Sequence, residues 1–321
     1  MRREITMQKT TGRPQLKENL KFFLTASMKG ISQVLLIDNA VTGFFILLII
    51  TSTSIFLGII TLLSTIIGTL IGIVGGADKE SVTQGLFGFN SVLTGIALAL
   101  FMNGPYHWII ALLGAALAAI LAAAMMHAMK PLGIPVLSAP FILITWFTLL
   151  VSYRLKAFTL TSELVPQDLA RWKLDTTGKV DWTEGAFYGI GQIFFLHETI
   201  AGVLLFLAVF WAGWRLGIFA IMGNLTALLA SYWLGGEHTL IFMGLYGYNG
   251  ILAILAVAIV FNDNKGWIQP LLSGILAAFL TVPLTASITT LLLPYGLPAL
   301  TMPFILSTWI ILGARKVLPK L

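Results

Sequence analysis

The chain has 321 residues, contains no cysteine and has few charged side chains. Without cysteine it has no disulfide bond, thiolate metal ligand or cysteine nucleophile. Only 10% of its residues are charged, against about 25% in soluble domains. No Asp, Glu, Lys or Arg lies between Asp38 and Asp78, between Glu80 and Lys130, or between Lys130 and Arg154. Each stretch can cross a bilayer, which takes roughly 20 apolar residues, so we expect an integral membrane protein.

Continuous apolar runs distinguish the two ways in which a chain can cross a bilayer. Strands of an outer-membrane barrel alternate in polarity over roughly 10 residues, whereas these runs are apolar throughout. We therefore predict an all-α polytopic membrane protein with ten spans. They are 41–58, 59–77, 84–103, 107–128 and 134–153 in the first half, and 201–216, 217–236, 243–262, 267–290 and 297–314 in the second.

Three blocks of sequence recur in the same order in the two halves. The block GISQV at 30–34 matches GIGQI at 189–193, and LFGFN at 86–90 matches LYGYN at 245–249, both shifted by 159 residues. A third block, PVLSAPFILITW at 135–146, matches PALTMPFILSTW at 298–309 with a shift of 163 residues. Three collinear matches indicate that the chain arose by duplication, as many transport proteins did.

Charge indicates how the two repeats are oriented. Five spans per half is an odd number, so the second repeat is expected to be inverted relative to the first. The first 29 residues hold seven Lys or Arg and two Glu, whereas the segment from Arg154 to Glu184 carries five basic and five acidic residues. Because Lys and Arg favour the cytoplasmic side, both termini are predicted to be cytoplasmic.

These features divide the chain into five segments. Residues 1–28 form a basic cytoplasmic arm, expected to be a solvated tail rather than a nucleic-acid-binding segment. The first repeat covers residues 29–153, a polar extracytoplasmic linker covers 154–187, the second repeat covers 188–314, and a cytoplasmic tail covers 315–321. No nucleic acid is expected as a partner, and the charge of +6 reflects topology.

Each half is predicted to contain broken structure at membrane depth. The segments around Gln33 and Gln192 are too short and too polar to span, so they are expected to be tilted re-entrant pore helices. Prolines interrupt the helical pattern at 131, 135 and 140 and again at 294, 298 and 303. Irregular backbone at this depth survives only where protein buries it or a polar cavity adjoins it, which predicts a central pathway.

Titratable side chains are scarce within the predicted spans. No carboxylate pair, histidine-rich metal spacing or nucleophile with a base occurs, so no catalytic residue, metal or cofactor is expected. An ion-coupled carrier usually places Asp, Glu or Arg inside its spans. Their absence from the central parts of these spans favours a passive path for an uncharged solute.

Neutral polar groups and aromatic rings recur at depth instead. They are the amides of Gln33 and Gln192, the rings of Phe89, Phe195 and Tyr248, and the hydroxyls of Ser138 and Thr301. Amides and hydroxyls offer uncharged donors and acceptors, which suit a flat polar solute held between ring faces. The alternative is structural: such groups also pack or link helices. For Asn90 and Asn249 we favour a capping or turn role.

These blocks resemble the urea transporter family in a short bacterial form, from about Gly30 to about Trp309. The resemblance implies ten transmembrane helices and two tilted pore helices, assembled as a homotrimer in the bacterial inner membrane with one pore per subunit. Urea would pass downhill, without coupling, through two sites bounded by aromatic slots and a hydroxyl-bearing middle.

The resemblance also implies which residues contact the solute. The inner site would use Gln33, Val34, Phe195, Tyr248 and Leu252; the outer site Gln192, Ile193, Leu36, Phe89 and Leu93; and the middle Ser138 and Thr301. Four places depart from the family pattern. Leu36 replaces a Phe, Ser138 replaces a Thr, and Asn39-Ala40 and Glu198-Thr199 replace Asn-Pro.

Two other functions remain open on the sequence alone. A pore for ammonia, water or short amides also needs a neutral path, although the chain lacks a clear pair of mid-span histidines and an Asn-Pro-Ala repeat. An ion-coupled carrier for a small solute is the other alternative. The expected partners are urea and the lipid bilayer.

Overall fold

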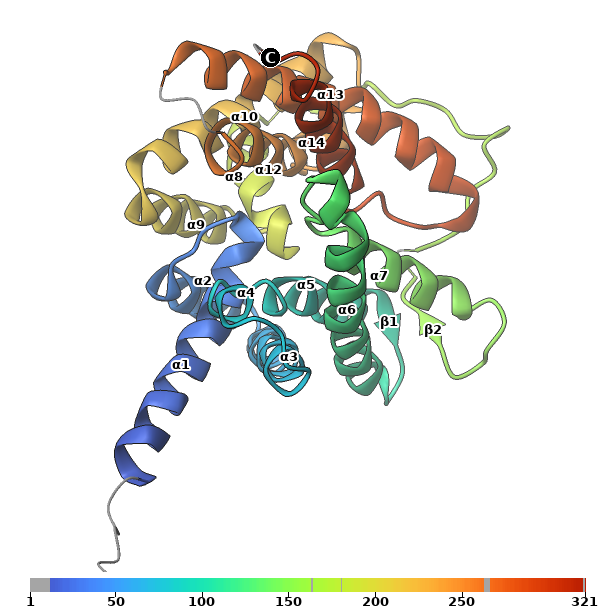
Figure 1. The fold of residues 1–321 in the computed structure, drawn as a ribbon. Coiled ribbons are helices and arrows are strands. Elements are labelled where there is room, and N and C mark those ends of the chain that lie inside the picture. The colour runs from blue at the N-terminus through green and yellow to red at the C-terminus, as the bar shows by residue number, and fades with distance from the viewer. Residues whose placement is uncertain (1–11, 163, 180, 263–265, 320) are drawn as a thin grey trace, which may run out of the picture.

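A computed structural model describes residues 12–162, 164–179, 181–262, 266–319 and 321 (Figure 1). In these ranges the only strands are β1 (Met102–Asn103) and β2 (Thr159–Leu160), which pair antiparallel, and every other regular element is helical. Several helices are long and apolar, as the continuous apolar runs require. The predicted fold class, an all-α polytopic membrane protein, is confirmed.

The two repeats contain the same succession of helices. In the first they are α1 (Gly12–Ser32), η1 (Gln33–Leu35), α2 (Ala40–Thr53), α3 (Ile55–Val74), α4 (Lys79–Thr83), α5 (Gly88–Phe101), α6 (His107–Met129), η2 (Lys130–Leu132) and α7 (Ala139–Val151). In the second they are α8 (Trp182–Gly191), η3 (Gln192–Phe194), α9 (Thr199–Ala212), α10 (Trp214–Trp233), α11 (His238–Phe242), α12 (Gly247–Leu255) with the π-helix η4 (Ala256–Val260), α13 (Ile268–Leu292), η5 (Leu293–Tyr295) and α14 (Met302–Arg315).

Helices α3, α6, α10 and α13 are each long and apolar enough to cross a membrane alone. Two further candidates among the described residues are bent pairs: α1 with α2, and α8 with α9, each bent by 74°. The remaining apolar helices are shorter. Predicted spans 84–103 and 134–153 are helical only over α5 and α7, because left-handed residues, Gly85 (φ +75°) and Leu137 (φ +53°), precede these helices.

Helix α1 differs from the prediction for the first pore helix. It begins at Gly12, inside the arm predicted for residues 1–28, and continues past that boundary to Ser32. Ala26 and Ser27 are buried, so this part of the arm packs against the rest of the protein. Gln33 therefore follows a helix of 21 residues rather than a short half-helix. Residues 1–11 of the predicted arm lie outside the described residues.

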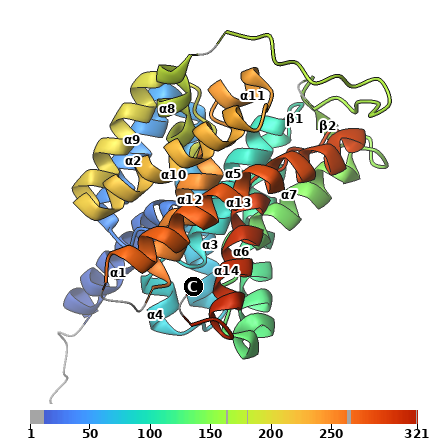
Figure 2. The ribbon, with the colours of Figure 1, turned by 90° about the horizontal axis from the view of Figure 1, so that it is seen from above.

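Equivalent turns of the two repeats lie beside different segments. Helix α4 lies against α1, with Lys79 Nζ 5.5 Å from the ring centre of Phe22, whereas its duplicate α11 lies against the linker, where His238 Nδ1 is 3.0 Å from Gly178 O. Figure 2 shows the linker along one side and α4 with the C-terminal end on the opposite side. We call these sides the linker face and the tail face.

Candidate functional site

A cavity of about 760 Å³ opens on the tail face, and we call it the vestibule. Its wall is formed by the segment from Asp78 through α4 to the start of α5, by the end of α6, and by the turn before α7. Gln33, Leu36 and Phe89, three of the predicted site residues, also line it. The vestibule therefore connects the tail face with part of the predicted site.

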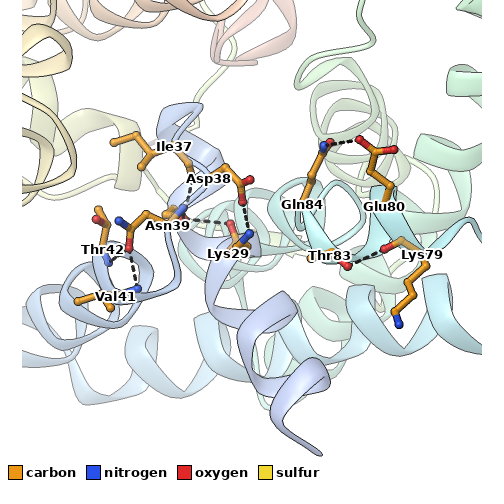
Figure 3. Close-up of polar contacts among 11 residues, drawn as sticks. Lys29, Ile37, Asp38, Asn39, Val41, Thr42, Lys79, Glu80, Thr83 and Gln84 are labelled. Atoms are coloured by element: carbon orange, nitrogen blue, oxygen red, sulfur yellow. Dashed lines mark hydrogen bonds and ion pairs between the residues drawn. The ribbon is translucent and has the colours of Figure 1, made fainter. Parts of the chain in front are cut away.

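Charged groups lie at the rim of the vestibule, among them Asp78 and Lys130, which are exposed. The pKa of Asp78 is lowered because its carboxylate accepts hydrogen bonds from Ser81, whose backbone N lies 2.8 Å from Oδ1. Figure 3 shows neighbouring polar contacts, including Gln84 Nε2 donating to Glu80 Oε1 at 3.3 Å. Among the described residues no group of three His, Asp or Glu could hold a metal ion.

Behind the vestibule the space narrows to a central void of about 10 Å³. This is about the volume that one water molecule requires. Gln33, Leu36, Phe89 and Leu137 line both spaces, so the vestibule leads to the void. The predicted site residues that line the void are Gln33, Val34, Leu36, Phe89, Leu93, Ser138, Ile193, Leu252 and Thr301, and none of its lining residues is ionisable.

The two predicted hydroxyls meet at the void. Ser138 Oγ and Thr301 Oγ1 are 2.7 Å apart and hydrogen-bonded, and both side chains are buried. They occupy equivalent positions, immediately before α7 and α14. Since each repeat contributes one of the pair, the contact lies where the two repeats meet.

Two buried asparagines hold the broken segments that carry these hydroxyls. Asn90 Nδ2 donates to Leu137 O (3.3 Å), and its Oδ1 accepts from Phe141 N (3.1 Å). In the second repeat Asn249 Nδ2 donates to Leu300 O (3.4 Å), and its Oδ1 accepts from Phe304 N (3.1 Å). Each side chain thus pairs with the carbonyl of the left-handed leucine (φ of 53° or 52°) and with an N–H in the first turn of the helix that follows. The structural role favoured for both asparagines is confirmed.

These hydrogen bonds predict that substitutions of the two equivalent asparagines lower the free energy of unfolding by different amounts. Asn90→Leu should lower the free energy of unfolding by about 1–3 kcal/mol, because it leaves a buried N–H and carbonyl unpaired. Asn249→Leu should cost less, since the Tyr248 hydroxyl also donates to Leu300 O, whereas the equivalent Phe89 has no hydroxyl. Thermal unfolding in detergent measures both. An equal or larger loss for Asn249→Leu would contradict this use of the tyrosine.

Reciprocal hydrogen bonds join the repeats on either side of the hydroxyl pair. Trp146 Nε1 donates to Pro298 O, and the equivalent Trp309 Nε1 donates to Pro135 O, both at 2.8 Å. Each repeat thus makes the same hydrogen bond to the other, which is the pattern expected for two units related by a two-fold axis. The tryptophans therefore hold the repeats together.

The two predicted glutamines have different surroundings. Gln192 is buried, and its Nε2 donates to Met243 O at 2.8 Å. Gln33 lines both the vestibule and the void, and its Oε1 is buried with no hydrogen-bond partner among the described residues. A buried unpaired oxygen costs about 1–3 kcal/mol. Gln33 therefore has an unpaired acceptor beside the passage, whereas Gln192 lines neither space and its Nε2 is bonded to Met243 O.

A left-handed turn follows each glutamine. Leu36 and Phe195 both have φ of 60°, and their backbone N–H groups donate to Gln33 O and Gln192 O. This conformation is uncommon for residues other than glycine, and such strain is concentrated at functional sites. The same left-handed turn therefore follows the glutamine in both repeats.

Three predicted site residues, Gln192, Phe195 and Tyr248, line neither the vestibule nor the central void. The Phe195 ring packs edge-on against Phe101, with ring centres 5.6 Å apart. The Tyr248 hydroxyl donates to Leu300 O. The structure does not bring these three residues into the passage that leads from the tail face.

The predicted grouping into inner and outer sites differs from the structure. The family resemblance groups Gln33 with Phe195 and Tyr248 in the inner site, but Gln33 lines the vestibule together with Leu36 and Phe89, which the resemblance places in the outer site. The vestibule opens on the tail face, so Gln33, Leu36 and Phe89 lie on the same side of the passage as the C-terminal tail.

Several lining residues were not predicted from the sequence. Leu137 and Phe304 contribute to the void, and His127 and Lys130 to the vestibule. For Leu137 a signal existed, because leucine precedes the hydroxyl residue in both copies of the third block. Lys130 had no such signal, because its position at the vestibule depends on how α6 packs.

The sequence of this chain is similar to those of known proteins. Residues 24–316 match the family model described as urea transporter. The chain is 26% identical over 302 residues to the sheep (Ovis aries) protein named Urea transporter 1 and 25% identical to the mouse (Mus musculus) protein of that name. Each alignment covers 90% of this chain and 76% of the relative.

Proposed function

This chain belongs to the urea transporter family, and we propose that urea crosses the membrane through the vestibule and the central void. It is a multi-pass membrane transporter of urea that works passively, and it is not an enzyme. The observation that carries the proposed path is the convergence of Gln33, Ser138 and Thr301, with their neutral polar groups, on one narrow space between the repeats.

The chemistry of the lining suits urea. The unpaired Gln33 Oε1 can accept an N–H of the solute, while a hydroxyl of the Ser138–Thr301 pair can donate to its carbonyl or accept from its N–H groups. Among the described residues no ionisable side chain lines the void, so an entering ion would lose hydration without a compensating charge. These properties support selection of a neutral, hydrogen-bonding solute.

The void is too small for urea as it stands. A space of about 10 Å³ holds one water at most, and urea has four non-hydrogen atoms. Passage therefore requires side chains around the void to separate. Leu36 and Phe89 are suited to such gating, because both side chains lie where the vestibule meets the void.

We also propose that the repeats are inverted. Support comes from the reciprocal Trp146 and Trp309 bonds and from α4 and α11 lying at opposite faces. Basic residues at both ends of the chain favour a cytoplasmic tail face, which makes the Leu36–Phe89 pair part of the inner entrance. We further propose, from the family resemblance, that the protein lies in the bacterial inner membrane as a homotrimer. Each subunit would then have its own passage.

Urea efflux from proteoliposomes tests the function directly. We expect stopped-flow light scattering to show urea equilibrating much faster than in protein-free vesicles, and equally fast after ion gradients and membrane potential are collapsed. A rate equal to that of empty vesicles would exclude transport. A rate that falls with the gradients would indicate an ion-coupled carrier, and equal acceleration of water or ammonia would indicate a less selective pore.

Leu36 should determine how strictly the passage selects flat solutes. Leu36 and Phe89 line the same passage, and a flexible aliphatic side chain yields to a methyl group, whereas a second ring would not. We expect Leu36→Phe to raise the ratio of urea to N-methylurea permeability by about tenfold, the usual discrimination for one extra methyl group. Leu36→Met, which keeps a flexible aliphatic chain, is the control and should leave the ratio unchanged. A higher N-methylurea permeability in Leu36→Phe would refute this role.

A further inference from the structure

A second pocket, of about 170 Å³, lies at the beginnings of α10 and α13. It is adjacent to the C-terminal tail, since Gln269 Nε2 donates to Pro319 O at 3.3 Å, and therefore lies on the tail face. None of its lining residues lines the vestibule or the void. They are Arg215, Phe219, Ala258, Ile259, Asn262, Gly266, Trp267 and Pro270.

Arg215 gives this pocket its charge. The guanidinium carbon lies 4.4 Å from the ring centre of Trp267 and 6.0 Å from that of Trp214. Stacking on an indole leaves the N–H edge of the guanidinium available for hydrogen bonds. Within the described part of the chain no carboxylate forms an ion pair with Arg215, and the first turns of α10 and α13 contain no acidic residue. Among the described residues, therefore, no neighbouring acid neutralises this positive charge.

The duplicate position has no such charge. Phe56 corresponds to Arg215 in the first repeat, and its ring lies 5.4 Å from that of His107, at the start of α6. The cation is thus present only in the second repeat, in which helix α10 begins at the tail face. A packing role alone does not require a cation, because an aromatic ring fills the equivalent position.

The surface around Arg215 is strongly apolar. Trp214 and Trp267 are exposed, and beside them on α13 Ile268 and Leu272 are 75% and 62% exposed. Exposed tryptophans beside apolar helix surface are typical of the depth at which lipid headgroups meet acyl chains. A soluble anion would contact only the guanidinium, whereas a phospholipid could use both the charge and this apolar surface.

We propose that this pocket binds the phosphate of an anionic phospholipid from the leaflet at the tail face. Arg215 donates to two phosphate oxygens, a geometry that its planar fork favours over a single contact. The acyl chains lie along Ile268 and Leu272. Basic pockets between transmembrane helices bind anionic headgroups by this chemistry, and the site is separate from the solute passage.

The test is the thermal stability of the whole protein in detergent, titrated with dioctanoyl-phosphatidylglycerol, with the phosphatidylcholine of equal chain length, or with inorganic phosphate. We expect phosphatidylglycerol to stabilise the wild type most. Arg215→Gln should need about tenfold more of it for the same shift, since charge-assisted bonds are lost. Trp267→Leu, which removes the ring that supports the guanidinium, should weaken the response in the same direction.

Arg154→Gln, which removes an exposed arginine at the start of the linker, is the matched control. Its thermal stability should respond to phosphatidylglycerol as that of the wild type does. Urea permeability of the Arg215 and Trp267 variants should remain unchanged in phosphatidylcholine vesicles, which shows that they are folded. A wild-type response to phosphatidylglycerol in Arg215→Gln would overturn the proposal. So would equal stabilisation by phosphatidylcholine, or by inorganic phosphate at the same concentration.

Discussion

Replacing Thr301 by valine is expected to lower urea permeability by at least about tenfold. Valine keeps the shape of threonine but removes the hydroxyl that pairs with Ser138 at 2.7 Å in the central void. Urea passing this point then loses a hydrogen-bonding partner after it has shed water. An unmade hydrogen bond in a buried site costs about 1–3 kcal/mol, and about 2 kcal/mol, the middle of that range, corresponds to a decrease in rate of more than about tenfold. Stopped-flow urea efflux from proteoliposomes measures the change.

The matched controls keep a hydroxyl at each position. Thr301→Ser and Ser138→Thr should retain urea permeability within about threefold, because the donor and acceptor remain. Ser138→Ala should resemble Thr301→Val, since it removes the other member of the pair. Wild-type flux in a well-folded Thr301→Val protein would show that the hydroxyls only join the repeats.

Gln33→Leu should decrease transport and leave stability unchanged or raise it. The buried Gln33 Oε1 has no partner among the described residues, so its removal breaks no hydrogen bond and eliminates an unsatisfied acceptor. Urea, however, loses an acceptor at the wall of the passage. We expect urea permeability to fall by about tenfold, while the unfolding temperature in detergent stays equal or increases.

Gln192→Leu is the internal comparison, because it changes the same amide in the other repeat. Gln192 Nε2 donates to Met243 O, and leucine would leave that carbonyl unpaired. We expect a loss of stability of about 1 kcal/mol or more and a smaller effect on transport than for Gln33→Leu. If the two variants behaved alike in both measurements, the difference between the glutamines would have no functional meaning.

Much of the passage could be predicted from the sequence because the chain repeats itself. Recurrence singled out Ser138 with Thr301 and Phe89 with Tyr248, among residue types that are otherwise common in membrane helices. However, a duplication offers two candidates for each contact, one in the same repeat and one in the other. The family resemblance groups Gln33 with Phe195 and Tyr248 of the other repeat, whereas Gln33 lines the vestibule beside Leu36 and Phe89.

Helix ends were harder to predict. Gly85 marks a break that any sequence analysis can suspect, because glycine tolerates positive φ. Leu137 and Leu300 adopt the same region without any such sign. Their conformation depends on Asn90 and Asn249, which bind the freed backbone groups from helices far along the chain. Tertiary hydrogen bonds thus set where α7 and α14 begin, which the local sequence does not indicate.

The sequence by itself determined that this protein lies in a membrane, that it is helical and that it was duplicated, because apolar length and recurrence are local properties of a chain. Only the tertiary structure decided which duplicated groups remain free. Gln33 and Gln192 occupy equivalent positions, yet only Gln192 meets a backbone carbonyl. Arg215 likewise lies far along the chain from Trp267 and becomes a candidate lipid ligand only because packing places them 4.4 Å apart.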